Sequence, residues 1–206
     1  MRPKPVYEGI MMSKTLASYW RFLLAGLFNQ GQTGAFLPSQ PFLVNLMIEP
    51  VPRDYSGRVL ELGPGTGVLT RRLAARCPGA RILACEINPT LAHDLEYNLA
   101  QARLSSRVQV VCDSAEHLLD SMRRRGTEPP DFIISGIPLG NLDRNMTFAL
   151  IDRISRALAP GGWYIQFQYS LLDRKKIKTT FDRLRTVPVL LNLPPAVIYY
   201  ARKALR

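Results

Sequence analysis

The chain has 206 residues, of which 47% are hydrophobic, so it is long and apolar enough for one globular unit with a sizeable core. Lys and Arg total 27 against 16 Asp and Glu, and the formal net charge is +11. A surplus of this size favours a polyanionic partner or an anionic membrane surface, and it does not separate the two. Three cysteines without CxxC spacing, Cys77, Cys85 and Cys112, indicate buried thiols in a reducing compartment and argue against a disulfide framework or a zinc site.

The N-terminal region contains an uncharged stretch, Phe22 to Ile48, that is long enough to cross a bilayer. Asn and Gln side chains interrupt it, and Pro38 and Pro41 break any continuous helix, so we do not expect a transmembrane span. A signal peptide is not expected either, because the apolar run begins only at residue 22 and no clean cleavage site follows it.

An amphipathic helix is predicted from about Ser13 to Asn29, with Ser13 as its N-cap. Arg21 falls on a narrow polar strip of this helix, while Tyr19 and Trp20 belong to a wide apolar arc. Such a helix needs an apolar surface to cover. Two interpretations stay open: it packs on its own domain, or it lies in a membrane interface with the two aromatic rings at headgroup level.

Beyond Pro52, short β-branched runs alternate with amphipathic helical stretches. This alternation predicts an α/β fold, a doubly wound, mostly parallel sheet of seven strands with helices on both faces. Five strands are expected at Val59–Leu62, Arg81–Glu86, Val108–Val111, Phe132–Ser135 and Trp163–Gln168, with helices over residues 67–77, 88–104, 114–125 and 145–159 between them. Residues 171–185 are expected to form one more helix, and residues 187–191 and 196–203 the last two strands at one sheet edge.

The stretch LELGPGTGVLT, residues 60–70, follows the first strand and opens the first helix. Ligands bind at this place in open α/β sheets, outside the carboxyl ends of the strands. Glycines there let the backbone approach a ligand closely. A P-loop would read GxxxxGK[ST], and the dinucleotide fingerprint would need a glycine where Val68 stands, so neither nucleotide motif fits.

The pattern E-x-G-x-G-x-G resembles the class I S-adenosylmethionine-dependent methyltransferases, and the resemblance covers nearly all of the chain after Arg58. It implies that the acid ending the first strand and the glycine loop hold the methionine part of the cofactor. The acid ending the second strand would accept hydrogen bonds from the ribose hydroxyls, and the turn after the third strand would read the adenine. The implied cofactor-binding residues are Glu61, Leu62, Gly63, Pro64, Gly65, Thr66, Gly67, Glu86, Ile87, Asp113, Ser114, Ala115, Ser135, Gly136 and Ser39.

The motif after the fourth strand discriminates between methyl acceptors. Adenine methyltransferases that act on nucleic acid resemble [DNS]-P-P-[YF] or N-[LI]-P-[YF] at this place, with an aromatic ring that stacks on the flipped base. This chain reads SGIPLGN, with Leu139 at the aromatic position. The motif argues against a nucleic-acid substrate, although ribosomal RNA adenine dimethyltransferases share the glycine loop and a basic surface and remain the alternative.

A closer resemblance is to the bacterial phospholipid N-methyltransferases, from about Tyr19 to the C-terminus. It is carried by GAFLPSQ, ELGPGTGVLT, SGIPL, FQYS and NLPPAVIYYARK, with a departure at Gln40, where a second small polar residue is expected. The resemblance implies an enzyme that methylates the amine of phosphatidylethanolamine, up to three times, to give phosphatidylcholine. In that family an N-terminal amphipathic helix is associated with membrane binding.

Methyl transfer to an amine is an in-line displacement, so the protein must hold a neutral amine near the methyl group and disperse positive charge. Aromatic faces stabilise the resulting cation. Tyr169, which leaves the fifth strand at its carboxyl end, is the expected ring, and Ser135 is the second candidate catalytic residue. Trp163 and Tyr164, which begin the same strand, are expected in the core or on the far side. No committed base is evident, and water, Tyr169 or a carbonyl of residues 135–137 would take the proton.

The expected organisation follows from these residues. Residues 1–52 would form the amphipathic helix and a lid segment, and residues 53–206 the methyltransferase domain. Tyr19, Trp20, Arg21 and Tyr169 would contact substrate and membrane. Basic clusters at 123–125, 174–178 and 201–206 fit attraction to anionic lipid. We expect a monomer without metal, peripheral on the cytoplasmic inner face of the cell membrane, with phosphatidylethanolamine and an anionic membrane surface as partners and no nucleic acid.

Overall fold

The computed structural model describes residues 39–190 and 195–205. The helix expected at Ser13 to Asn29, with Tyr19, Trp20 and Arg21, lies outside these residues. The helices are α2 (Ser39–Ile48), α3 (Val68–Arg76), α4 (Pro89–Gln101), α5 (Ala115–Arg124), α6 (Arg144–Ala157) and α7 (Arg174–Thr180). The strands are β1 (Arg58–Leu62), β2 (Arg81–Glu86), β3 (Val108–Cys112), β4 (Phe132–Ser135), β5 (Trp163–Gln168), β6 (Arg183–Val189) and β7 (Ala196–Arg202).

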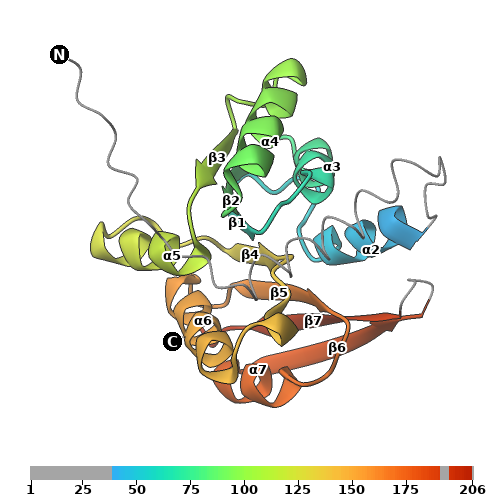
Figure 1. The fold of residues 1–206 in the computed structure, drawn as a ribbon, viewed down its shortest axis with the longest axis vertical. Coiled ribbons are helices and arrows are strands. Elements are labelled where there is room, and N and C mark those ends of the chain that lie inside the picture. Colours follow the sequence, from blue (N-terminus) through green and yellow to red (C-terminus); the bar gives the residue numbers. More distant parts are fainter. Residues whose placement is uncertain (1–38, 191–194, 206) are drawn as a thin grey trace. The chain divides into compact units, whose positions relative to one another are not determined.

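The strands form one seven-stranded sheet in the order β3-β2-β1-β4-β5-β7-β6 (Figure 1), which confirms the predicted fold class. Strands β1 to β5 pair in parallel, and β7 runs antiparallel to both β5 and β6. The chain winds from β1 towards β3 in one direction and from β4 towards β6 in the other. The strand order therefore reverses between β1 and β4, where open α/β sheets place their ligand crevice.

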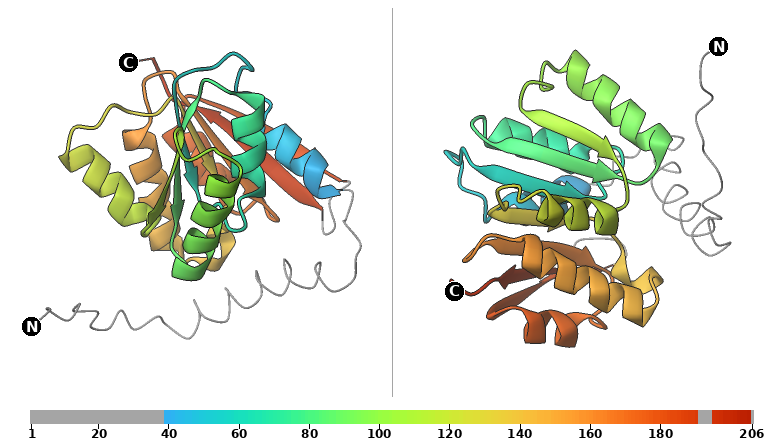
Figure 2. Two further views of the ribbon diagram at one scale, coloured as in Figure 1. Left: turned by 90° about the horizontal axis from the view of Figure 1, so that it is seen from above. Right: turned by 90° about the vertical axis from the view of Figure 1, so that its left-hand side faces the viewer.

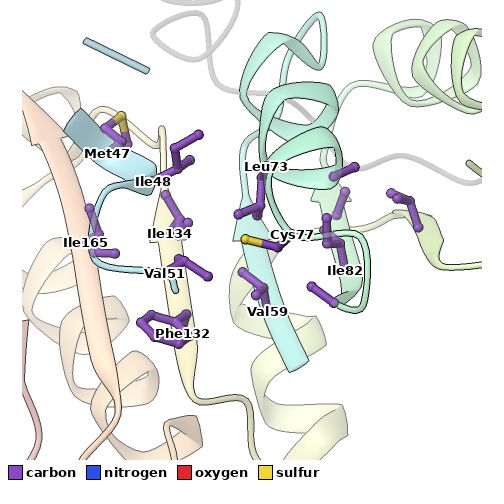
Figure 3. Close-up of a cluster of buried hydrophobic side chains, with 14 of the residues drawn as sticks. Met47, Ile48, Val51, Val59, Leu73, Cys77, Ile82, Phe132, Ile134 and Ile165 are labelled. Carbon is purple, nitrogen blue, oxygen red and sulfur yellow. The ribbon is translucent and has the colours of Figure 1, made fainter. Parts of the chain in front are cut away.

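Helices cover both faces of this sheet (Figure 2). Buried side chains of α2, α3 and α4 form one core with one face of the strands, and those of α5, α6 and α7 form a second core with the other face. In the first core, Met47, Ile48 and Val51 lie beside Ile134 and Ile165 of the central strands (Figure 3). The central strands are thus packed on both sides, and the loops that follow them are the places to examine first for a ligand.

Helix α2 was not expected from the sequence, because Pro38 and Pro41 were interpreted as helix breakers. Pro41 is the third residue of α2, in its first turn, where a backbone N–H has no partner within the helix and its loss costs little. The buried side chains of Met47 and Ile48 join α2 to the core. In the described part of the chain no helix is long and apolar enough to cross a membrane.

Two further expectations were wrong, and both concern edge strands. The helix expected over residues 171–185 covers only Arg174–Thr180, and β6 begins at Arg183, because pairing with β7 along its whole length makes this segment a strand. Cys112 is exposed rather than buried, because it is the last residue of β3, which is the outermost strand on the other side of the sheet from β6.

Candidate functional site

The glycine loop joins β1 to α3 at the carboxyl edge of the sheet. Gly65 and Gly67 have φ angles of +56° and +76°, in the left-handed region that side chains with a Cβ rarely adopt. The backbone N–H of Gly63 donates to the carbonyl oxygen of Cys85 at 2.9 Å, which ties the start of the loop to β2. A Cβ on Gly65 would meet no atom within 4 Å, so this part of the loop faces open space.

Glu86, the buried acid at the end of β2, holds the glycine loop. Its Oε2 accepts a hydrogen bond from the N–H of Gly65 at 3.0 Å, and its Oε1 accepts one from the N–H of Asn88 at 2.9 Å. Burial raises the pKa of this carboxyl, and the backbone donors oppose the rise. Because each carboxylate oxygen has two lone pairs, Glu86 can still accept a hydrogen bond from a ligand hydroxyl.

Glu61, the acid near the end of β1, is buried and incompletely paired. Its Oε2 and the hydroxyl of Thr70 have no hydrogen-bond partner in the described part of the chain. Burial raises the pKa of Glu61 to about 7. The nearby Thr70 hydroxyl opposes the rise, although it does not form a hydrogen bond of good geometry, and the carboxylate of Glu86 adds to the rise. A buried carboxylate without a donor is costly. An ammonium group of a ligand would supply the missing donor, so the residues present fit the methionine part of the expected cofactor.

Asp113 begins the turn after β3, beside the first two acids. Its N–H donates to the carbonyl oxygen of Glu86 at 3.1 Å, and its Oδ1 accepts from the N–H of Ser114 at 2.7 Å. Its Oδ2 lies 2.6 Å from Nδ1 of His117, and the Ser114 hydroxyl caps α5 by accepting from the His117 N–H at 3.1 Å. Sequence reasoning missed His117 as a partner of Asp113. The spacing of four residues across a helix start was the available signal.

The SGIPL turn after β4 packs directly on the glycine loop. The N–H of Gly136 donates to the carbonyl oxygen of Leu62 at 2.9 Å. A Cβ on Gly136 would lie 2.8 Å from the carbonyl oxygen of Gly63, so glycine is required by this close approach. The buried hydroxyl of Ser135 accepts from the N–H of Ile137 at 3.2 Å. The first and fourth strands thus bring both sequence motifs to one place.

A buried hydrogen-bond network supports the same turn from β5. Nε2 of Gln166 donates to the carbonyl oxygen of Ile137 at 2.8 Å, and the Tyr164 hydroxyl donates to Oε1 of Gln166 at 2.6 Å. Both side chains are fully buried, as predicted for Tyr164, and burial raises the pKa of the Tyr164 phenol. Sequence reasoning missed Gln166, because a buried amide that reaches a carbonyl from another strand has no local signal.

Tyr169 lies one residue beyond β5, at the same edge of the sheet. Its side chain is 57% exposed, and its ring makes an edge-to-face contact with Phe167 at a centroid distance of 4.8 Å. Asp173, four residues later, is buried, and its Oδ2 has no hydrogen-bond partner in the described residues. Burial raises the pKa of Asp173. Asp173 is a second incompletely paired acid that sequence reasoning missed.

The other expected site residues divide into three groups. Leu62, Pro64 and Ala115 are buried beside the loops, while Thr66 and Ile87 are exposed there. Ser39 begins α2, and its side chain is not described. The expected residues that the described structure brings to the carboxyl edge are Glu61, Leu62, Gly63, Pro64, Gly65, Thr66, Gly67, Glu86, Ile87, Asp113, Ser114, Ala115, Ser135, Gly136 and Tyr169.

Comparison with known proteins gives a family match and a fold match. Residues 59–162 match a family model described as a methyltransferase domain. In solved structures, the "SAM Dependent Methyltransferase from Agrobacterium tumefaciens" is similar with a TM-score of 0.63 and 18% identity, covering 84% of this chain and 64% of that chain.

Two curated relatives differ in how much of the chain they match. An ornithine lipid N-methyltransferase of Singulisphaera acidiphila is 29% identical over 185 residues, which are 88% of this chain and 95% of the relative. A tRNA1(Val) (adenine(37)-N6)-methyltransferase of Bacteroides fragilis is 39% identical over 61 residues, which are 30% of this chain and 25% of the relative. The lipid-methylating relative is therefore matched along nearly its whole length.

Proposed function

The chain belongs to the methyltransferase domain family, and from this premise we propose that it is an S-adenosylmethionine-dependent N-methyltransferase of membrane aminolipids. The proposed acceptor is the amine of phosphatidylethanolamine, methylated in up to three rounds to phosphatidylcholine. The observation that carries the proposal is the match along 95% of the length of a relative that is named a lipid N-methyltransferase.

Ornithine lipid is the second candidate acceptor, because it is the substrate in the name of that relative. Both lipids present an amine at a membrane surface, so the same displacement chemistry serves either. An RNA adenine is a weaker candidate. Leu139, at the place where a base-stacking ring is expected, is 0% exposed, so its side chain belongs to the core and does not offer a stacking face.

The acids at the strand ends have separate proposed roles toward the cofactor. Glu61 and the glycine loop would hold the methionine ammonium and carboxylate, because Oε2 of Glu61 has no hydrogen-bond partner among the described residues and the loop faces open space at Gly65. Glu86 would accept from the ribose hydroxyls. Asp113 would accept from the adenine amino group, with the backbone of Ser114 and Ala115 beside it. We keep Ser39 as a proposed cofactor contact from the start of α2.

S-adenosylmethionine supplies a methyl group on a positively charged sulfur, which is transferred to the amine nitrogen as the carbon–sulfur bond breaks and a thioether leaves. The chain's own residues orient the amine. The Ser135 hydroxyl and the Ile137 carbonyl would accept hydrogen bonds from it, and Gln166 holds that carbonyl in place. The Tyr169 ring would face the cationic nitrogen that each transfer creates. The proton that the amine loses would pass to water.

We further propose that the protein acts as a monomer, peripheral on the cytoplasmic inner face of the cell membrane. Residues 1–52 would contribute the amphipathic helix and a lid over the site, with Tyr19, Trp20 and Arg21 in contact with lipid. Among the described residues no cluster of His, Cys, Asp and Glu could hold a metal ion.

Methyl transfer from labelled S-adenosylmethionine tests the acceptor directly. Vesicles of phosphatidylethanolamine with anionic lipid, vesicles of ornithine lipid and unmodified ribosomal RNA are offered in parallel to the full-length protein. We expect label in methylated phosphatidylethanolamine, with the products resolved by chromatography. Label in ornithine lipid alone would replace the acceptor, and label in RNA alone would overturn the lipid proposal.

A further inference from the structure

Exposed leucines gather in the turn that joins β5 to α7. Leu171 is 59% exposed and Leu172 is 81% exposed, next to the half-exposed ring of Tyr169. The turn is nevertheless held to the sheet, because the Tyr199 hydroxyl of β7 donates to the carbonyl oxygen of Ser170 at 3.1 Å. The fold therefore keeps two large apolar side chains in water at a fixed place, which is unfavourable unless another apolar surface covers them.

Two more exposed apolar side chains lie at the same edge of the sheet. Leu190, 76% exposed, directly follows β6. Pro188 in β6 pairs with Val197 in β7, and Val197 pairs with Gln168, the last residue of β5, so Leu190 and the leucine turn emerge on one side. Met146, also exposed, stands in the first turn of α6, which follows β4 at that edge (Figure 1).

Basic side chains flank these apolar residues. Arg174 and Lys175 begin α7 and are exposed. Behind them, the guanidinium of Arg144 and the ammonium of Lys176 lie over the ring of Phe148, at 5.3 Å and 5.4 Å from its centroid, which connects the basic ends of α6 and α7. The acids nearby are Asp143, which caps α6, the buried Asp173, and Asp152, which pairs with Lys176. The exposed surplus is positive.

We propose that this edge docks on an anionic phospholipid bilayer through a carboxyl-edge rim, defined as Met146, Leu171, Leu172, Leu190, Arg174 and Lys175. The leucines enter the boundary between headgroups and acyl chains, and the two basic side chains contact headgroup phosphates. An RNA would be attracted by the same charges, but it would leave the leucines in water. The mixed apolar and basic character therefore favours a membrane surface.

The inference rests on the proposed function, and it explains how a lipid amine could reach the site from a membrane. The rim lies at the same edge of the sheet as the glycine loop and the SGIPL turn. A lipid amine could then approach the site while its acyl chains stay in the membrane. The rim also adds a second membrane contact, within the described fold, to the one proposed for the N-terminal helix.

The test is binding of the full-length protein to vesicles of phosphatidylcholine and phosphatidylglycerol, without amine lipid and without cofactor. The double variant Leu171→Ser, Leu172→Ser should bind about tenfold or more weakly than the parent, because it loses apolar insertion. The matched control is Leu205→Ser. Leu205 is 75% exposed but lies against Gly161, which precedes β5 at the amino ends of the strands, away from the rim. This variant should therefore bind within about twofold of the parent.

A second readout reports insertion without removing apolar surface. The variant Leu172→Trp should show a larger blue shift of its emission on addition of vesicles, and stronger quenching by brominated lipid tails, than the parent, which already contains Trp20 and Trp163. Equal vesicle binding by the double variant and the parent, or no binding by the parent, would overturn the rim. Affinity for S-adenosylhomocysteine should be the same in the double variant and the parent, which shows that the fold is intact.

This experiment separates failure of the rim from failure of the proposed function. If the parent binds vesicles through the leucines but transfers no methyl group to any lipid, only the proposed function fails. If the protein methylates lipid while the double variant binds vesicles as tightly as the parent, only the rim fails. The rim would also be overturned if the parent bound RNA and vesicles changed the emission of Leu172→Trp no more than that of the parent.

Discussion

The backbone N–H of Gly65 and Oε2 of Glu86 form a 3.0 Å hydrogen bond, so the acid that ends β2 fixes the loop that follows β1. Glu86 also accepts from Asn88, at 2.9 Å, and therefore organises two of the loops that build the site. Its substitution should affect ligand affinity through these loops as well as through direct contact.

Glu86→Ala should weaken binding of S-adenosylhomocysteine by about 100-fold or more, because two backbone donors lose their acceptor and the ribose loses its partner. Glu86→Gln keeps one acceptor oxygen and should lose less, about tenfold. Calorimetric titration measures both. Glu96→Ala, at an exposed position of α4, is the control and should bind like the parent. Parent-like affinity in Glu86→Ala would contradict the assignment.

Gly65→Ala and Gly126→Ala form a matched pair. Both glycines have positive φ, +56° and +60°, and a Cβ on either meets nothing within 4 Å, so each substitution should cost about 1 kcal/mol of unfolding free energy. Gly65 alone lies in the proposed cofactor loop. We expect Gly65→Ala to lower cofactor affinity at least tenfold and Gly126→Ala to leave it unchanged. Equal affinities of the two variants would place the cofactor elsewhere.

Glu61 should make stability and cofactor binding depend on pH in opposite directions. Burial raises its pKa from 4.5 to about 7, so the folded state holds a proton that the unfolded state releases. The stability that the bound proton contributes is therefore fully present below pH 4.5. As the pH rises to about 7, the free energy of unfolding falls by about 3 kcal/mol. Glu61→Gln should be more stable than the parent at pH 8, and denaturant titration at several pH values measures this.

The ionised form of Glu61 is the one that would attract the methionine ammonium. Affinity of the parent for S-adenosylhomocysteine should therefore rise as the pH increases from 6 to 8, through the pKa of about 7. Glu61→Gln should bind weakly and without this pH dependence. A flat profile in the parent would mean that Glu61 does not contact a cationic part of the ligand.

Substitutions in the buried pair Tyr164 and Gln166 should change both the free energy of unfolding and kcat. Gln166→Leu leaves the buried Tyr164 hydroxyl without its acceptor, which should cost about 1–3 kcal/mol of unfolding free energy. Adding Tyr164→Phe removes the unpaired hydroxyl and should restore part of that loss. Cofactor affinity should stay constant, while kcat falls because the Ile137 carbonyl loses its donor. A variant with reduced stability but unchanged kcat would make Gln166 purely structural.

Tyr169→Phe and Tyr169→Ala distinguish the ring from the hydroxyl. A cation held by an aromatic face gains about 0.5–2 kcal/mol, so the alanine variant should lose up to about 30-fold in kcat/KM and the phenylalanine variant little. The loss should be larger for the dimethylated lipid than for the unmethylated one, because charge is then permanent after transfer. Equal losses in both variants would assign the role to the hydroxyl.

The sequence predicts the central strands well for a physical reason. The observed bounds of β2, β4 and β5 coincide with the expected ones, because each is a short, mostly apolar segment that contributes to the cores on the faces of the sheet. Since parallel strands end at one edge, the motifs that follow β1 to β4 could be placed together without coordinates. The contact between Gly136 and Gly63 is a direct consequence of that register.

The remaining features depend on tertiary context. α2 contains a proline that a local rule interprets as a break, and its buried face becomes evident only against β4 and β5. β6 is stabilised by pairing with β7, not by its own pattern. Gln166 reaches a carbonyl in the turn after β4, and Leu171 and Leu172 can be assigned a function only once the fold shows where they lie.

The most direct test of the central claim is the lipid composition of a bacterium that makes phosphatidylethanolamine but none of its methylated forms, after expression of this protein. We predict mono-, di- and trimethylated phosphatidylethanolamine in the lipid extract by mass spectrometry, and their absence with Gly65→Ala. Unmodified lipids, from cells whose purified protein still binds S-adenosylhomocysteine, would contradict the account.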